Sequence, residues 1–94
     1  MILEQTLIIH GKVQGVGYRQ SVIRFLDNEY IDLKGFVTNM PNGTVKIVAQ
    51  GKKEDIARLR NFASKGPEKA KVKQIEESLR EIRQFSYESF EIQY

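Results

Sequence analysis

The chain has 94 residues, of which 40% are hydrophobic, and its formal net charge is +3. This length fits one domain, expected to span residues 1–94. There is no cysteine, so the core must come from apolar packing alone, and a disulfide, a thiolate zinc site and a Cys nucleophile are all excluded. No apolar run approaches the roughly 18 residues of a membrane span, and the first residues lack a secretory signal. We therefore expect a cytoplasmic monomer without membrane contacts.

Charge is unevenly distributed in the second half of the chain. Between Lys52 and Lys73 there are eight Lys or Arg residues against three acids, whereas Glu76–Tyr94 contains five acids against two Arg residues. A basic segment can attract anions or nucleic acid. The favoured interpretation is a solvated helix face and its flanks.

The first half of the chain predicts a strand, a loop, a helix and a hairpin. Alternating apolar residues in Glu4–His10 predict the strand, and apolar residues at helical spacing over Arg19–Tyr30, Tyr30 included, predict the helix. Phe36–Asn39 and Thr44–Gln50 flank the dipeptide Asn42-Gly43. This dipeptide can supply the positive φ angles of a tight hairpin, so the two flanks read as antiparallel strands.

The second half predicts a helix, an ambiguous segment and a strand. Glu54–Ser64 presents apolar residues on one face, and Gly66-Pro67 closes that helix. Apolar residues in segment 72–82 recur at helical intervals, so periodicity alone favours a helix there, whereas Phe90–Tyr94 alternates like a strand. If the ambiguous segment is a strand, the order gives an α+β, ferredoxin-like βαββαβ sandwich, with two helices on one face of an antiparallel sheet.

The loop Gly11–Arg19 lies between the first strand and the first helix. Its three glycines allow consecutive backbone N–H groups to point inward as an anion nest. The following helix adds unpaired N–H groups, and Arg19 in its first turn can bind two phosphate oxygens at once. The loop is neither a P-loop nor a dinucleotide fingerprint, because the required residues and spacing are missing. From these residues alone, a phosphate site and a tight structural turn both remain open.

Two ordered segments resemble signatures of the acylphosphatase family. Gly11-Lys12-Val13-Gln14-Gly15-Val16-Gly17-Tyr18-Arg19 matches the pattern Gly-x-Val-Gln-Gly-Val-x-(Phe or Tyr)-Arg. The second segment, Gly35-Phe36-Val37-Thr38-Asn39-Met40-Pro41-Asn42-Gly43-Thr44-Val45 followed by Gly51, is similar to the second signature. Gly66-Pro67 and the ending Phe90–Tyr94 are also similar, so the resemblance spans nearly the whole chain.

The resemblance implies a fold, an activity and a set of site residues. The family's ferredoxin-like fold implies a strand over about Ala70–Ser78, despite the helix-like period there. The implied enzyme is an acylphosphatase that cleaves the carboxyl–phosphate bond of small acyl phosphates without a metal or a cofactor. Its phosphate-binding arginine corresponds to Arg19 and its water-orienting asparagine to Asn39. The substrate-binding cradle, in which a phosphate or sulfate ion is expected, would comprise Val13, Gln14, Gly15, Val16, Gly17, Tyr18 and Arg19.

The sequence departs from the family pattern between the two functional side chains. The stretch from Arg19 to Asn39 is slightly longer than usual, with the excess in Asp27–Asp32, and Asp32 occupies a position where glycine is common. We expect extra residues at the far end of the first helix to leave both functional ends in place. Thr38, at a position that is more often Arg, Lys, Gln or Ala, should point to the opposite sheet face from Asn39.

Other candidate groups and functions fit less well. His10 is the only histidine and is expected to be structural or solvent-facing rather than a modulator of the anion site. Ser21 has no His within the motif to activate it. An RNA-binding module of the same element order would need the pattern Arg/Lys-Gly-aromatic-Gly/Ala-aromatic-Val. Lys34-Gly35-Phe36 starts like this pattern, but Val37, Thr38 and Asn39 break it, so nucleic acid is not an expected partner. The same signature also occurs in larger carbamoyl-transfer proteins, and a fold kept for protein contacts is a further alternative; because the chain ends at Tyr94, a free-standing enzyme is favoured.

Overall fold

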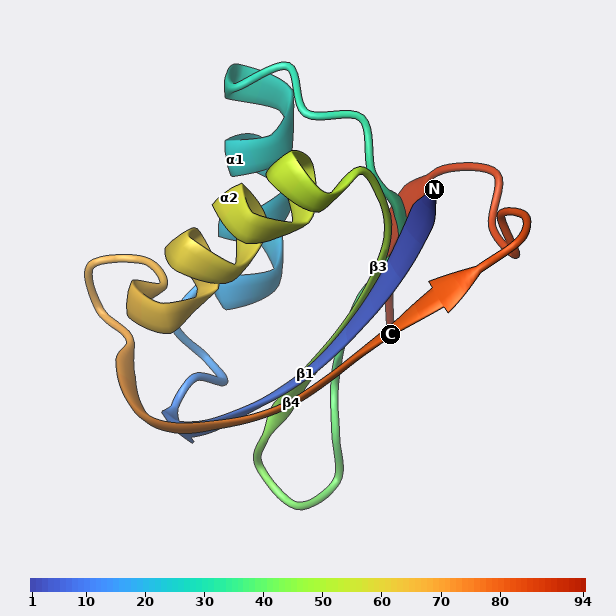
Figure 1. Ribbon diagram of the computed structural model, residues 1–94. Helices are drawn as coiled ribbons and strands as arrows, with labels where there is room; N and C mark the ends of the chain where they lie inside the picture. Colours follow the sequence, from blue (N-terminus) through green and yellow to red (C-terminus); the bar gives the residue numbers. More distant parts are fainter.

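The computed structural model describes residues 1–94 and contains five strands and two helices. In chain order these are β1 (Ile2–Lys12), α1 (Tyr18–Asn28), β2 (Lys34–Asn39), β3 (Val45–Gly51), α2 (Lys53–Lys65), β4 (Lys71–Ile82) and β5 (Phe90–Gln93). The strands form one sheet in the order β4-β1-β3-β2-β5, and both helices cover the same face of it (Figure 1). The predicted ferredoxin-like α+β fold is confirmed.

The direction of the last strand differs from the expectation of an antiparallel sheet. β1, β2, β3 and β4 pair antiparallel, but β5 lies parallel to β2, so the sheet is mixed. The connection from β4 to β5 crosses the face of the sheet that the helices leave open. There the backbone N–H of Ser86 donates to Oε1 of Gln50 at 2.8 Å, and the Tyr87 ring packs edge-on against Phe36.

A bulge explains why Val72 and Ile75, the first two apolar residues of segment 72–82, have the spacing of a helix although the segment is a strand. The register of β4 against β1 shifts between His10 and Gly11, which leaves one additional residue of β4 between their partners. Val72 and Ile75, three residues apart, consequently both pack against the core. The implied strand at Ala70–Ser78 is therefore present and extends further, to Ile82.

The core lies between the helices and the covered face of the sheet. Along β1, Leu3, Leu7 and Ile9 alternate with half-buried residues and point toward the helices. The first helix ends earlier than expected, at Asn28, and Tyr30 is 95% exposed with φ of 54°. Tyr30 is therefore not part of the buried face, and Ile31 is buried in its place. The other buried hydrophobic residues are Val13, Tyr18, Val22, Leu26, Leu33, Val37, Val45, Ile47, Val48, Ala49, Ile56, Leu59 and Ala63.

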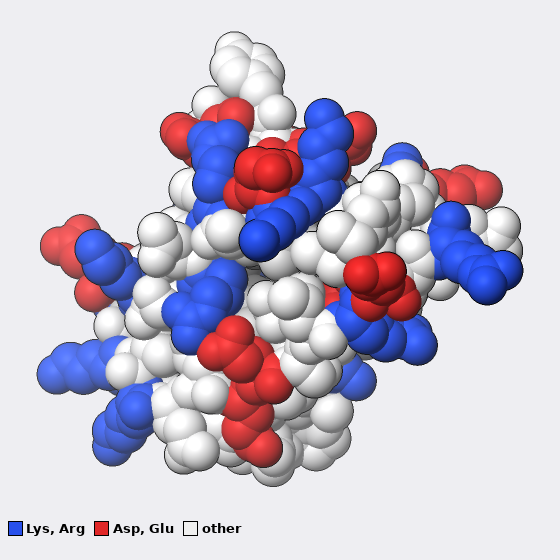
Figure 2. Space-filling model, viewed as in Figure 1, with Lys and Arg blue, Asp and Glu red and all other residues white.

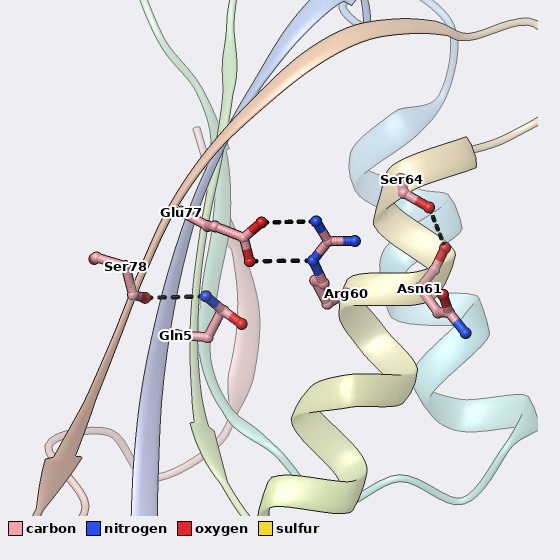
Figure 3. A network of polar contacts seen from close by, with 6 residues as sticks. All are labelled: Gln5, Arg60, Asn61, Ser64, Glu77 and Ser78. Atoms are coloured by element: carbon pink, nitrogen blue, oxygen red, sulfur yellow. Dashed lines mark hydrogen bonds and ion pairs between the residues drawn. The ribbon is translucent and has the colours of Figure 1, made fainter.

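Polar contacts join α2 to the edge strand β4, as Figure 3 shows. Arg60 of α2 donates from Nε and Nη2 to the two carboxylate oxygens of Glu77, at 3.1 and 2.6 Å. Beneath this pair, Nε2 of Gln5 donates to the backbone oxygen of Ser78 at 3.0 Å, which ties β1 to β4. The helix is thus fixed over a strand that contributes few apolar contacts of its own.

Glu4 is the centre of a second network, on the open face of the sheet. Its carboxylate accepts hydrogen bonds from Gln50 at 2.6 Å and from Arg80 at 2.8 Å. Burial of this carboxylate acts to raise its pKa, but the hydrogen bonds from Gln50 and Arg80 outweigh burial and lower the pKa of Glu4 below its ordinary value of 4.5. Because the side chain of Gln50 is fully buried, its amide N–H2 depends on Glu4 as an acceptor.

We expect Glu4→Leu to lower the free energy of unfolding by about 1–3 kcal/mol at pH 7, because it leaves a buried amide donor of Gln50 unpaired. The lowered pKa means that the stabilisation by ionised Glu4 is present above pH 4.5 and is lost as the pH falls through the folded-state value. Urea unfolding at pH 7 and at pH 3 should therefore show a smaller difference between wild type and variant at pH 3. An undiminished difference at pH 3 would contradict the role of the ionised carboxylate.

Candidate active site

The ends of several strands meet at one edge of the sheet. β1 and β2 are both antiparallel to β3, so they run in the same direction and their last residues, Lys12 and Asn39, lie at the same end of the sheet. β3 and β4 begin at that end, with Val45 and Lys71. The loop from Val13 to Gly17 leaves β1 here and leads into α1, so it lies where the chain returns from the sheet to the helix layer.

Two glycines give this loop its shape. Gly15 and Gly17 have φ angles of 73° and 75°, in the left-handed region that residues with a Cβ rarely adopt. Gly17 directly precedes α1, and no side chain caps the helix there. The first turn of α1 also contains no acidic residue. The N–H groups of this turn are consequently available to an anion, and the partial positive charge of the helix end is not neutralised.

Side chains on both sides of the glycines fix the loop to the rest of the fold. Nε2 of Gln14 donates to the backbone oxygens of Met40 and Thr44, at 2.8 and 2.9 Å, and so holds the loop against the β2–β3 hairpin. The hydroxyl of Tyr18, which is 2% exposed, donates to the backbone oxygen of Ala63 in α2 at 2.6 Å. Burial raises the pKa of Tyr18, so its phenol stays protonated as this donor.

A hollow of about 160 Å³ opens between this loop and the end of β2. Arg19 reaches it from the first turn of α1 and Asn39 from the last residue of β2. A water molecule takes about 30 Å³ of liquid volume, so there is room for a tetrahedral anion together with water. The lining consists of Val13, Gly15, Gly17, Tyr18, Arg19, Gln20 and Asn39.

Two polar side chains of the hollow, those of Arg19 and Asn39, are free to bind a ligand. The guanidinium of Arg19 forms none of the ion pairs of the protein and lies 4.8 Å from the centre of the Tyr94 ring, a cation–π contact. Asn39 pairs with Val45 through the backbone, and no hydrogen bond joins its side chain to another residue. Its neighbour Thr38 bonds instead to the backbone oxygen of Gln93 at 2.9 Å.

The sequence-predicted site residues divide into those that line the hollow and those that do not. Arg19 and Asn39, from separate signatures, are brought together, along with Val13, Gly15, Gly17 and Tyr18. Gln14 and Val16 do not line the hollow, and the Gln14 side chain is directed to the hairpin. Sequence reasoning missed Gln20, next to the predicted arginine, and Tyr94, whose contact with Arg19 follows from the parallel pairing of β5.

Two other residues considered from the sequence lie outside the hollow. Nε2 of His10 is 2.6 Å from the Glu76 carboxylate on the neighbouring strand β4. Ser21 is buried, and its hydroxyl donates to the backbone oxygen of Tyr18 at 2.6 Å.

No group of three His, Cys, Asp or Glu side chains is close enough together to hold a metal ion. Neither helix combines the length and the apolar composition needed to cross a membrane.

Comparisons with known proteins agree with the fold and with the family that the sequence resembles. A family model described as Acylphosphatase matches residues 5–92. A curated acylphosphatase of Acaryochloris marina is 40% identical over 81 residues, which cover 83% of this chain and 85% of that protein. A crystal structure of the acylphosphatase from Bacillus subtilis superposes with a TM-score of 0.88 at 29% identity, covering 98% of this chain and 99% of that chain. The fold also recurs in full-length HypF in its phosphate- and nucleotide-bound form, with a TM-score of 0.77 and 26% identity, where it covers all of this chain and 12% of that chain.

The ferredoxin-like sandwich, with a hollow between a glycine turn and the end of β2, defines a small α+β protein of the ferredoxin-like class. The family match extends over nearly all of it, and the chain belongs to the acylphosphatase family. The predicted family and the predicted enzyme class, an acylphosphatase, are confirmed.

The contact of Arg19 with Tyr94 can be tested through anion affinity. We expect Tyr94→Ala to weaken competitive inhibition by inorganic phosphate about 2- to 5-fold, because an exposed cation–π contact contributes about 0.5–1 kcal/mol to holding the guanidinium in place. Tyr94→Phe keeps the ring and should retain the wild-type inhibition constant. Equal weakening in both variants would show that the ring face does not position Arg19.

Proposed function

We propose that this protein hydrolyses small acyl phosphates, with the phosphate held by the loop Val13–Arg19 and the attacking water held by Asn39. The observation that carries the proposal is the hollow itself, because it unites the free side chains of Arg19 and Asn39 beside the uncapped start of α1. Membership of the acylphosphatase family supports acyl phosphates as the substrate class.

The hollow offers several independent attractions to a phosphate dianion. Backbone N–H groups of the left-handed turn and of the first turn of α1 are directed at a bound anion, as in other anion nests. The planar fork of Arg19 can donate to two phosphate oxygens at once. No Asp or Glu is among the lining residues, so no carboxylate repels the ligand. The fold also occurs within full-length HypF, whose crystal structure is of a phosphate- and nucleotide-bound form.

The reaction needs little acid catalysis. An acyl phosphate is a mixed anhydride, so a carboxylate is a good leaving group. Water attacks phosphorus, the bond between phosphorus and the acyl oxygen breaks, and the carboxylate leaves with the bonding electrons. The main obstacle is the negative charge of the phosphate, and the cradle with Arg19 neutralises it in the transition state without a metal ion.

Asn39 serves to position the water. Its amide does not titrate near neutral pH, so it cannot take the proton, but it can both accept a hydrogen bond from water and donate one to it. Asn39 would hold the water in line with the departing acyl oxygen. This lowers the activation free energy, because the water is already oriented when the reaction begins. The proton passes to an oxygen of the substrate's own phosphate group, which leaves as inorganic phosphate.

We expect Arg19→Ala to reduce hydrolysis of benzoyl phosphate by at least about 10²–10³-fold, as loss of a transition-state donor does. It should also weaken competitive inhibition by inorganic phosphate, because Arg19 binds the ground state as well. Loss of benzoyl absorbance in the ultraviolet measures the rate. Arg19→Lys is the matched control: it keeps the charge but not the two-pronged donor, and should recover only part of both effects.

The role of Asn39 is separable from that of Arg19. We expect Asn39→Ala to lower kcat for benzoyl phosphate by about 10²-fold or more, as misplacement of a reacting group does, while the inhibition constant for inorganic phosphate stays close to wild type. Thermal unfolding of the variant should match wild type, since the Asn39 side chain has no partner in the fold. Wild-type turnover by a folded Asn39→Ala variant would refute the positioning role.

A further inference from the structure

Four exposed lysines gather at the end of the sheet that holds the hollow. Lys12 is the last residue of β1, Lys71 is the first residue of β4, and Lys69 and Lys73 flank it in sequence. Figure 2, viewed as Figure 1, shows basic side chains projecting where β1 ends and β4 begins. We call these four residues the lysine patch.

The charges of the lysine patch are not used within the fold. The basic residues of α2 behave differently: Arg58 pairs with Glu29 and Arg60 with Glu77. None of the four lysines forms an ion pair, and Glu68 is the one acid between Lys65 and Gln74. Lys12 and Lys71 are moreover direct cross-strand partners, and like charges in that relation destabilise a sheet. The patch therefore has no stabilising role that would account for it.

The lysine patch adjoins the wall of the hollow. Lys12 directly precedes Val13, which lines the hollow. The turn that carries Lys69 packs on Tyr18, another lining residue, so closely that a Cβ at Gly66 would lie 2.6 Å from Cε2 of that ring. Because charges in solution act over a Debye length of about 8–10 Å at physiological salt, lysines that adjoin lining residues can attract an anionic ligand at the wall.

The strand order places the lysine patch across the sheet from Asn39. At this end of the sheet the order is Lys71 on β4, Lys12 on β1, Val45 on β3 and Asn39 on β2. The lysine patch therefore lies on the side of the sheet away from Asn39, the residue proposed to hold the water. In an in-line displacement the leaving group departs opposite the water.

We propose that the lysine patch makes this enzyme selective for acyl phosphates whose acyl group carries an additional negative charge. This inference rests on the proposed function and adds the substrate class to it. The patch raises the local concentration of such substrates and attracts their second anionic group, an effect that grows with substrate charge and falls with ionic strength.

The experiment compares benzoyl phosphate with 4-carboxybenzoyl phosphate, which differ by one carboxylate. For the double variant Lys12→Gln and Lys71→Gln we expect kcat/KM for the carboxylated substrate to fall about 5- to 10-fold at low salt, within the range of electrostatic steering. For benzoyl phosphate the fall should be about 2-fold or less, and both effects should vanish at about 1 M salt, where the Debye length is about 3 Å.

A matched control removes equal charge elsewhere. Lys52 and Lys53 are exposed at the start of α2, whose other end leads to the patch, so Lys52→Gln with Lys53→Gln should leave the ratio of kcat/KM for the two substrates unchanged. An unchanged ratio in the patch variant, or an equal change in the control, would overturn the inference. If wild type hydrolysed neither substrate, the proposed function itself would fail. Because the patch variant relieves a repulsion, its thermal unfolding should occur at or above the wild-type temperature.

Discussion

The candidate site depends on a helix that begins without a cap. Gly17 enters α1 from a left-handed conformation, and neither a side-chain cap nor an acidic residue satisfies the first turn. Such a helix start normally costs stability. Here the fold compensates with contacts on both sides of the turn, from Gln14 to the hairpin and from Tyr18 to α2. Unpaired N–H groups can therefore stay directed at one point in space, which is the preorganisation that an anion site requires.

The direction of the strands places the parts of the candidate site at one end of the sheet. Because β1 and β2 run in the same direction with β3 between them, the cradle and Asn39 meet at one end of the sheet without either being part of a long loop. The parallel strand β5 extends the same edge and brings the Tyr94 ring to Arg19. The side chains proposed to hold the phosphate and the water thus come from different elements, Arg19 from the start of α1 and Asn39 from the end of β2.

Sequence reasoning was strongest where local rules determine the structure. The glycine loop, the hairpin at Asn42-Gly43 and both helices follow from backbone preferences and apolar spacing, and the family resemblance paired Arg19 with Asn39. Sequence reasoning was weakest where pairing between distant segments of the chain determines the structure. The bulge opposite Gly11 lets Val72 and Ile75, three residues apart, both pack against the core. Tyr30 leaves the helix because the chain reverses there at positive φ, and the Tyr94 contact depends on the parallel strand β5. None of these three has a local signal.

The slightly longer stretch between Arg19 and Asn39 illustrates why such a site tolerates change. Residues 29–33 lie beyond the end of α1, where Ile31 and Leu33 are buried and Tyr30 and Asp32 are exposed. The hollow is instead built from the start of α1 and the end of β2, each held by its own contacts. Since the lining contains no Asp, Glu or His, and Arg stays charged across the working pH range of proteins, no side chain there is suited to take up a proton near neutral pH. In the proposed reaction the chemistry depends on fixed geometry and on the ionisation of the substrate, and no residue from the far end of the helix lines the hollow.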